Sequence, residues 1–468
     1  MNETDLFEGF PSVSAKAWKQ RIQYDLKGAD YNESLVWESL EGIKVKPFYH
    51  SEDLEGVEAF PFEREGRPWM IAQELYAADS DKTGHRALTL LQKGVDSPIF
   101  TLPSQDVDFK ALLSKIELDR VPLHFNFLFL EVGAIKRLLS KIEGHKAPIY
   151  FNLDPIGQLV REGNWFHGFD RDFEHLGEVL GSATSQGPGS ILGIDMAHCH
   201  EAGANAVQQL AYGLAHANEY LHHFAHGPRK TVFPGKSFPI CFQVAMGSNY
   251  FFEIAKIRAL RWLWNSLLGE YGLVGDCHIL ARPGRRNKTL YDYNVNLLRC
   301  TSECMSAILG GADTVCNLPY DALYHKDNEF GQRLARNQLL ILREESHFNR
   351  ISHAANGAYY IETLTRQLAQ GALELFKGIE AGGGFINSLK KGSIQKKIKG
   401  NAAREQQLFD AGKIVSLGTN SHQNPEDRIK GELQLHPFAK TRVRKTLIEP
   451  IVARRLAEGL EQKRLEDE

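Results

Sequence analysis

The sequence predicts an α/β protein whose core is a TIM-type (β/α)8 barrel, and three observations support this prediction. Eight short apolar runs follow one another after about residue 69, and each is long enough for one buried strand. Helical patterns alternate with these runs, as they do in parallel βα units. The runs are apolar on consecutive residues, which is typical of strands buried on both faces. A doubly wound open sheet is the structural alternative.

The individual elements follow in order along the chain. The eight predicted strands begin near Trp69, Pro98, Leu123, Ile149, Ile191, Pro239, Val274 and Asp313. Helices are predicted between them where apolar residues repeat at helical spacing, most clearly over 206–221, 252–268 and 294–309. In a barrel of this type, active-site positions lie in the loops at the carboxyl ends of the strands.

The chain divides into three predicted parts. Residues 1–68 form an N-terminal helix and an extended arm, residues 69–350 form the barrel, and residues 351–468 form a C-terminal helical extension. The opening helix has Ser14 as its candidate N-cap and ends before Gly28. We expect this helix to precede the core rather than to belong to it.

Three patterns stand out in the C-terminal part. The glycine run 382–384 lacks the Lys-Ser/Thr ending of a phosphate-binding loop and follows no predicted strand, so we expect a flexible turn. The basic stretch 390–399 could contact the phosphates of a nucleotide-like ligand such as coenzyme A, but such runs are more often solvated helix faces. A charged helix is predicted over residues 450–468.

Composition excludes several classes of protein. The chain has 468 residues, 43% of them hydrophobic, which favours one large domain with appendages. A net charge of only −3 provides no overall field for nucleic acid or an acidic membrane surface. The acidic N-terminus lacks the features of a secretion signal and no apolar run is long enough to span a membrane, so we expect a cytoplasmic protein.

The cysteines indicate a reduced, structural role. Their positions are scattered: Cys199, Cys241, Cys277, Cys300, Cys304 and Cys316. This is not the dense spacing of a disulfide-stapled secreted domain. Cys300 and Cys304 share one face of a predicted helix, where buried thiols commonly act as small hydrophobes.

The densest group of polar residues lies in residues 195–204, at the end of a predicted barrel strand. His198 could act there as a general acid or as a hydrogen-bond donor to a substrate carbonyl. A metal site of His198, Cys199 and His200 is disfavoured, because consecutive residues point in different directions and no fourth ligand is evident, so no metal is expected. A histidine satisfied by its own loop is the alternative that the residues by themselves favour.

Several strings occur in a fixed order between Trp18 and Arg444. They cover residues 26–31, 41–47, 200–204, 246–259, 333–337, 344–346 and 357–365. In this order they resemble the barrel of the adenosylcobalamin-dependent methylmalonyl-CoA mutase family. The resemblance implies an N-terminal arm that wraps around another subunit, and it makes His198 the match of the family's active-site histidine.

The sequence departs from the family at positions that carry function. Catalytic chains have an Arg-Gln-Tyr string after the first barrel strand, where this chain reads Ala72-Gln73-Glu74. The family's arginine and serine near the coenzyme A ester match Pro239 and Cys241, and a proline cannot replace a guanidinium in binding an anion. The resemblance therefore implies vestigial catalytic positions at His198 and Glu74 and degenerate substrate positions at Ala72, Pro239 and Cys241.

The family's cobalamin-binding motif, Asp-x-His-x-x-Gly, has no complete copy in the sequence. The nearest string, residues 276–281, lacks the glycine and falls inside a predicted strand. The residues after 350 are charged and helical, and we expect no cobalamin-binding domain among them. The resemblance thus implies that this chain binds no cofactor and that adenosylcobalamin is held by a large subunit.

Three functions are compatible with these departures. The favoured one is a non-catalytic small subunit that forms a heterodimer with the large catalytic subunit of the isomerase that interconverts methylmalonyl-CoA and succinyl-CoA in propionate metabolism. In that role it stabilises its partner by mass action and is inactive alone. The alternatives are a substrate-binding barrel that recruits a separate cobalamin-binding subunit, and a chaperone-like protein that binds a mutase reversibly.

Overall fold

A computed structural model of the chain describes residues 9, 12–56, 68–183, 189–226, 237–440 and 443–468. Predictions for the remaining residues, which include most of the arm between 57 and 67, lie outside these ranges. Of the helices described, none is both long and apolar enough to cross a membrane.

The predicted TIM-type barrel is confirmed. Its strands are β3 (Met70–Tyr76), β4 (Ser97–Leu102), β5 (Leu123–Phe127), β6 (Ile149–Leu153), β7 (Gly189–Asp195), β8 (Ile240–Met246), β9 (His278–Pro283) and β10 (Thr314–Cys316). All neighbours are parallel, and β10 pairs with both β9 and β3, which closes the sheet. Closure excludes the doubly wound alternative, because an open sheet would leave two edge strands.

Seven of the eight strands begin within two residues of the predicted starts, but β9 begins at His278 and not near Val274. Val274 forms only an isolated bridge to Ser237. The next residue, Gly275, has a φ of +136°, which L-residues with side chains rarely adopt and which interrupts an extended strand. The apolar pattern alone does not reveal this break.

Helices cover the outside of the barrel. They are α3 (Ser80–Gln92), α4 (Phe109–Leu113), α5 (Val132–Lys141), α6 (Pro155–Glu162), α7 (Phe169–Ala183), α8 (Ala197–Glu201), α9 (Ala206–Leu221), α10 (Tyr250–Glu270), α11 (Val295–Gly310) and α12 (Glu329–Leu340). The bounds of α9 are those predicted, and α10 and α11 lie within two residues of their predictions. Asn205 caps α9 through a reciprocal bond with Gln208, which explains its sharp start.

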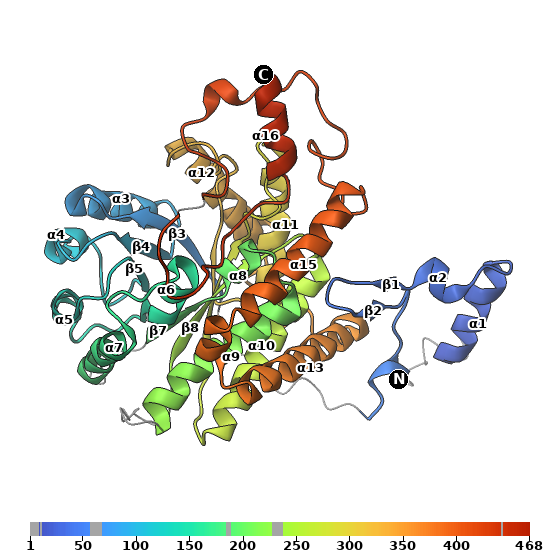
Figure 1. Cartoon of the computed structure of the whole chain (residues 1–468), viewed down its shortest axis with the longest axis horizontal. Helices are drawn as coiled ribbons and strands as arrows, with labels where there is room; N and C mark the ends of the chain where they lie inside the picture. The colour runs from blue at the N-terminus through green and yellow to red at the C-terminus, as the bar shows by residue number, and fades with distance from the viewer. Residues whose placement is uncertain (1–8, 10–11, 57–67, 184–188, 227–236, 441–442) are drawn as a thin grey trace, which may run out of the picture.

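Three C-terminal helices, α13 (Tyr359–Ala381), α14 (Phe385–Lys390) and α15 (Ser393–Asp410), run along the barrel helices. α13 packs against α9 and α10, as Figure 1 shows. The chain then returns across the barrel, drawn in dark red, to end in α16 (Glu458–Asp467). The division into barrel and extension stays a prediction.

The last helix is shorter than predicted, because residues 450–457 are not helical. Their backbone amides donate to groups of the barrel instead: Ile451 to the carbonyl of Val160, Arg454 to that of Glu201, and Leu456 to that of Arg286. A helix would have to give up these bonds. We call residues 447–457 the C-terminal strap.

The N-terminal arm lies to one side of the barrel (Figure 1). It contains α1 (Ala15–Asp25), α2 (Tyr31–Leu35) and a small hairpin of β1 (Trp37–Glu38) and β2 (Lys44–Val45). Ser14 caps α1 as predicted, by accepting a hydrogen bond from the amide of Ala17. α1 has no buried residue, which confirms that it stands apart from the core.

Candidate functional site

The carboxyl ends of the barrel strands open into a cavity of about 760 Å³. We call this cavity the barrel mouth. Its walls come from β3, β9, β10, α8 and α12, and the C-terminal strap forms part of its cover. Three of the predicted positions, Ala72, Glu74 and His198, line it.

Glu74 lies on β3 near the rim of the mouth. Its side chain is exposed, and Oε1 accepts a hydrogen bond of 2.8 Å from the hydroxyl of Thr101 on β4. Ala72, two residues earlier on the same strand, is buried in the barrel interior. A carboxylate and a methyl group therefore stand at this wall, and neither can form the bidentate contact to an anion that an arginine provides.

Pro239 and Cys241 do not line the mouth. Cys241 is fully buried in a cluster inside the barrel, and burial raises the pKa of its thiol well above the ordinary value. Pro239 is exposed and precedes β8, so it lies at the amino end of the strand, opposite the mouth. Their match to substrate-binding positions stays a prediction.

His198 lies on the short helix α8, under the C-terminal strap. Its Nε2 is 2.6 Å from the carbonyl oxygen of Ile451, and because a carbonyl only accepts, Nε2 carries the proton and donates it. Burial lowers the pKa of His198, although Asp195 opposes the shift. The imidazole is thus neutral near pH 7, and its one N–H proton holds the strap.

The two histidines of the metal alternative contact different partners, and the cysteine is a buried thiol. Nδ1 of His200 lies 3.2 Å from the side-chain amide nitrogen of Gln209, whereas His198 contacts the strap. Burial raises the pKa of Cys199 to about 12, so its thiol is protonated. No group of three His, Cys, Asp or Glu side chains within the described ranges could hold a metal ion.

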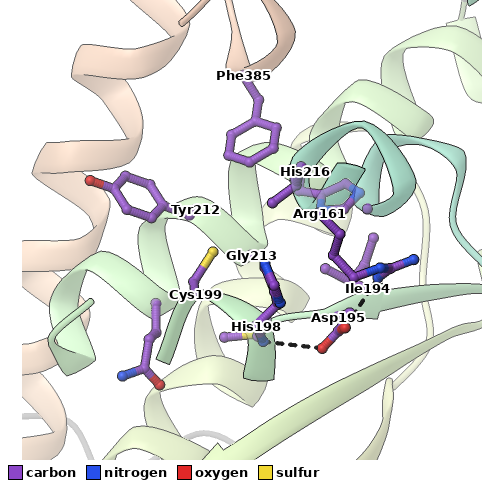
Figure 2. A pocket seen from close by; sticks show the side chains of 13 residues that line it. Arg161, Ile194, Asp195, His198, Cys199, Tyr212, Gly213, His216 and Phe385 are labelled. Carbon is purple, nitrogen blue, oxygen red and sulfur yellow. Dashed lines mark hydrogen bonds and ion pairs between the residues drawn. The ribbon is translucent and has the colours of Figure 1, made fainter. Parts of the chain in front are cut away.

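A small cavity of about 10 Å³ lies behind α8 (Figure 2). That volume is close to the least that holds one water molecule. Arg161 points to Asp195 in this view, and the ion pair between them measures 3.1 Å. His198 and Cys199 leave α8 in different directions.

A buried ionic network that was not predicted from the sequence adjoins this cavity. Asp154, directly after β6, lies 2.7 Å from Nε2 of His216 and accepts a hydrogen bond of 2.8 Å from the hydroxyl of Tyr220. Burial opposes ionisation of Asp154, but His216 and Arg161 outweigh it and hold its pKa below the ordinary value. A polar residue directly after a predicted strand was the available signal, but its partners are more than sixty positions away along the chain.

The barrel interior below the mouth is filled with aromatic rings. Tyr150 stacks on His278 at a centroid distance of 3.9 Å and on His124 at 4.5 Å. Neither ring nitrogen of His124 has a hydrogen-bond partner among the described residues, and burial lowers its pKa well below the ordinary value. This stack is part of a packed interior, as in other barrels of this type.

The stack also tests whether the string at residues 276–281 fits cobalamin. His278, the histidine of that string, faces Tyr150, and its Nε2 lies 3.0 Å from the hydroxyl of Thr314. A histidine held inside the barrel cannot reach a cobalt ion held above the mouth. The string therefore does not fit a cobalamin-ligating role.

The glycine run at 382–384 forms a turn between α13 and α14, as expected. Gly384 has a φ of +90°, and the carboxylate of Glu219 accepts a hydrogen bond from the amide of Ile386 beside it. A side chain of the protein already occupies the place of an anion there, which excludes a phosphate cradle. The following basic residues Lys396, Lys397 and Lys399 are exposed on α15, in agreement with a solvated helix face.

Comparison with known proteins identifies the family. The methylmalonyl-CoA mutase family model matches residues 104–464. The methylmalonyl-CoA mutase small subunit of Porphyromonas gingivalis is 34% identical over 446 residues, which cover 90% of this chain and 71% of that protein. The small subunit of Streptomyces virginiae is 30% identical, covering 83% and 67%, and the methylmalonyl-CoA mutase of Cereibacter sphaeroides is 29% identical, covering 87% and 64%. The chain therefore belongs to the methylmalonyl-CoA mutase family.

Proposed function

We propose that this chain is the non-catalytic small subunit of a heterodimeric methylmalonyl-CoA mutase and stabilises the large catalytic subunit. The observation that carries the proposal is the hydrogen bond that His198 donates within the chain. Its N–H donates to the carbonyl of Ile451, so the proton that a general acid would deliver is engaged within the chain. Two of the similar proteins are named small subunits, which supports the same role.

The residues at the mouth support an inactive barrel. Ala72 and Glu74 both line the mouth, and the family resemblance matches them to an arginine and a tyrosine of catalytic chains. In the assembled enzyme the large subunit would hold adenosylcobalamin, which supplies radical chemistry there. Residues of this chain would contribute binding surface only.

The N-terminal arm supports a protein partner. Trp18 is 45% exposed and Tyr24 is 75% exposed, both on a helix without any buried residue. Trp18 stacks on Phe48 at 4.4 Å, so the arm has internal structure although it does not pack into the core. Aromatic side chains held on a projecting element are typical anchors of a subunit interface.

The first experiment is a mutase assay on the purified chain with methylmalonyl-CoA and adenosylcobalamin. We expect no succinyl-CoA from the chain alone. When the chain is mixed with a large subunit, we expect stoichiometric copurification and a higher melting temperature of that subunit. Turnover by the isolated chain would contradict the proposal.

A matched pair of variants tests the arm. Trp18→Ala with Tyr24→Ala should weaken copurification, whereas Val415→Ala, an exposed apolar residue outside the arm, should not. Because α1 contributes nothing to the core, the melting temperature of the isolated chain should stay unchanged in all variants. Equal copurification of the arm variant and the control would exclude the arm as the interface.

The split-mutase alternative rests on the retention of His198 at the mouth. It predicts turnover when the chain is mixed with a separate cobalamin-binding protein in the absence of a full-length mutase. A chaperone-like role predicts reversible, substoichiometric association instead. The copurification experiment distinguishes both from a permanent subunit.

A further inference from the structure

Among the residues that the structure describes, the buried arginines have carboxylate partners, with one exception. The ion pairs are Arg258–Glu362 at 2.6 Å, Arg261–Asp313 at 2.9 Å, Arg286–Glu405 at 2.6 Å and Arg455–Glu461 at 2.7 Å. Arg336 on α12 is buried as well, but it forms no ion pair within the described part of the chain. A buried guanidinium without a counter-charge is unfavourable, so this exception calls for a physical reason.

Arg336 uses few of its five N–H donors. Only 7% of the residue is exposed, and its Nη1 donates one hydrogen bond of 3.1 Å to the side-chain oxygen of Gln73 on β3. Its Nε is buried and has no acceptor among the described residues. Burial lowers the pKa of Arg336, because the surroundings of the side chain disfavour its charged form. The remaining donors are available to a ligand.

A second arginine at the mouth is in a similar situation. Arg282, near the carboxyl end of β9, is half-buried, and its side chain makes no hydrogen bond or ion pair within 4 Å to any described residue. Burial opposes its charge, but Asp195 and Glu74 outweigh burial and hold the pKa of Arg282 above its ordinary value. Those two carboxylates have nearer partners, Asp195 in Arg161 and Glu74 in the Thr101 hydroxyl.

Both arginines line the barrel mouth, whose volume of about 760 Å³ lies within the range of small-molecule sites. Its lining contains seven lysine or arginine residues and five aspartate or glutamate residues, so its excess charge is positive. Guanidinium groups present paired donors in a plane, and this arrangement matches the two oxygens of a carboxylate or phosphate group. An oxyanion would place a negatively charged oxygen within hydrogen-bond distance of each guanidinium, which no described carboxylate does.

We propose that the barrel mouth binds a small organic oxyanion, carried as a carboxylate or a phosphate group, and that Arg282 and Arg336 are its ligands. This site does not depend on mutase turnover. The chain would then sense or store a small metabolite at the place where catalytic barrels of its family react theirs.

Binding is tested by calorimetric titration of the purified chain with malonate and, separately, with inorganic phosphate at constant ionic strength. Arg282→Gln and Arg336→Gln should each weaken binding about tenfold or more, as expected from the loss of a charged, hydrogen-bonded ligand. Arg120→Gln is the matched control, because Arg120 is exposed and lies outside the mouth. Tighter binding of malonate identifies a carboxylate ligand, and tighter binding of phosphate identifies a phosphorylated one.

The proposal is overturned if neither anion binds, or if the arginine variants bind as tightly as the wild type and Arg120→Gln do. Should Arg336→Gln fail to fold, Arg282→Gln decides the question alone, because its half-buried position tolerates the change. None of these measurements uses methylmalonyl-CoA or a large subunit. Their failure would therefore leave the proposed subunit role standing, and failure of the subunit role would leave the anion site standing.

Discussion

Arginines in the helical layer around the barrel, which we call the shell, differ from two arginines at the barrel mouth in whether a carboxylate contacts them. In the shell, Arg258 is buried against Glu362 and also donates to Thr365, so its charge is neutralised within the chain. At the mouth, Arg282 and Arg336 have no carboxylate within 4 Å among the described residues. The difference indicates that Arg258 serves stability, whereas Arg282 and Arg336 remain available to a group from outside the chain.

The largest effect is expected in the shell. Arg258→Met leaves the buried carboxylate of Glu362 without its cation and should lower the free energy of unfolding by about 3–5 kcal/mol. Urea denaturation of the isolated chain measures this loss. A change below about 1 kcal/mol would break the comparison, because the shell would then tolerate an unpaired charge as the mouth does.

A smaller loss is expected at Asp154, which belongs to the neutralised network behind α8. Because its pKa is lower in the folded protein than in the unfolded chain, the carboxylate adds stability at neutral pH that is lost as the pH falls below about 4. Asp154→Asn should lower the free energy of unfolding at pH 7 by about 2 kcal/mol and flatten this acid dependence. Asp119→Asn, at an exposed position, is the control and should leave the pH profile unchanged.

The same arginine-to-methionine change should not destabilise the protein at the mouth. Arg336→Met removes a buried charge that has no partner in the chain, so in anion-free buffer it should be neutral or raise the free energy of unfolding by about 1 kcal/mol. Comparison with Arg258→Met under identical conditions sharpens the contrast. Losses of similar size in both variants would show that Arg336 is neutralised within the chain after all.

The smallest effect is expected for Glu74→Tyr. Glu74 is exposed and makes one hydrogen bond, to Thr101, so the free energy of unfolding should change by less than about 1 kcal/mol. The variant should also show no mutase turnover, because the family's arginine is still missing at Ala72. Measurable succinyl-CoA from this single variant would contradict a degenerate mouth.

The barrel could be predicted from the sequence because its signals are local. Apolar runs of strand length and helical spacing between them lie within short windows, and α9 even carries its own capping pair at Asn205 and Gln208. The predicted start of β9 and the predicted length of α16 were wrong because both depend on contacts that are not local in sequence. Gly275 and the strap at 450–457 take their conformations from contacts that no short window contains.

The sequence by itself thus determined the fold class and the order of the strands, and it predicts the positions that depart from the family. Only the tertiary structure decided what the polar residues do. His198 and Ile451 are 253 positions apart, and Arg258 and Glu362 are 104 apart. The physical reason is that an apolar residue needs only some apolar neighbour, whereas a charge or a hydrogen-bond donor needs one particular partner in one geometry. Packing of the C-terminal segments on the barrel brings those partners together, and it leaves the side chains of Arg282 and Arg336 without a carboxylate within 4 Å among the described residues.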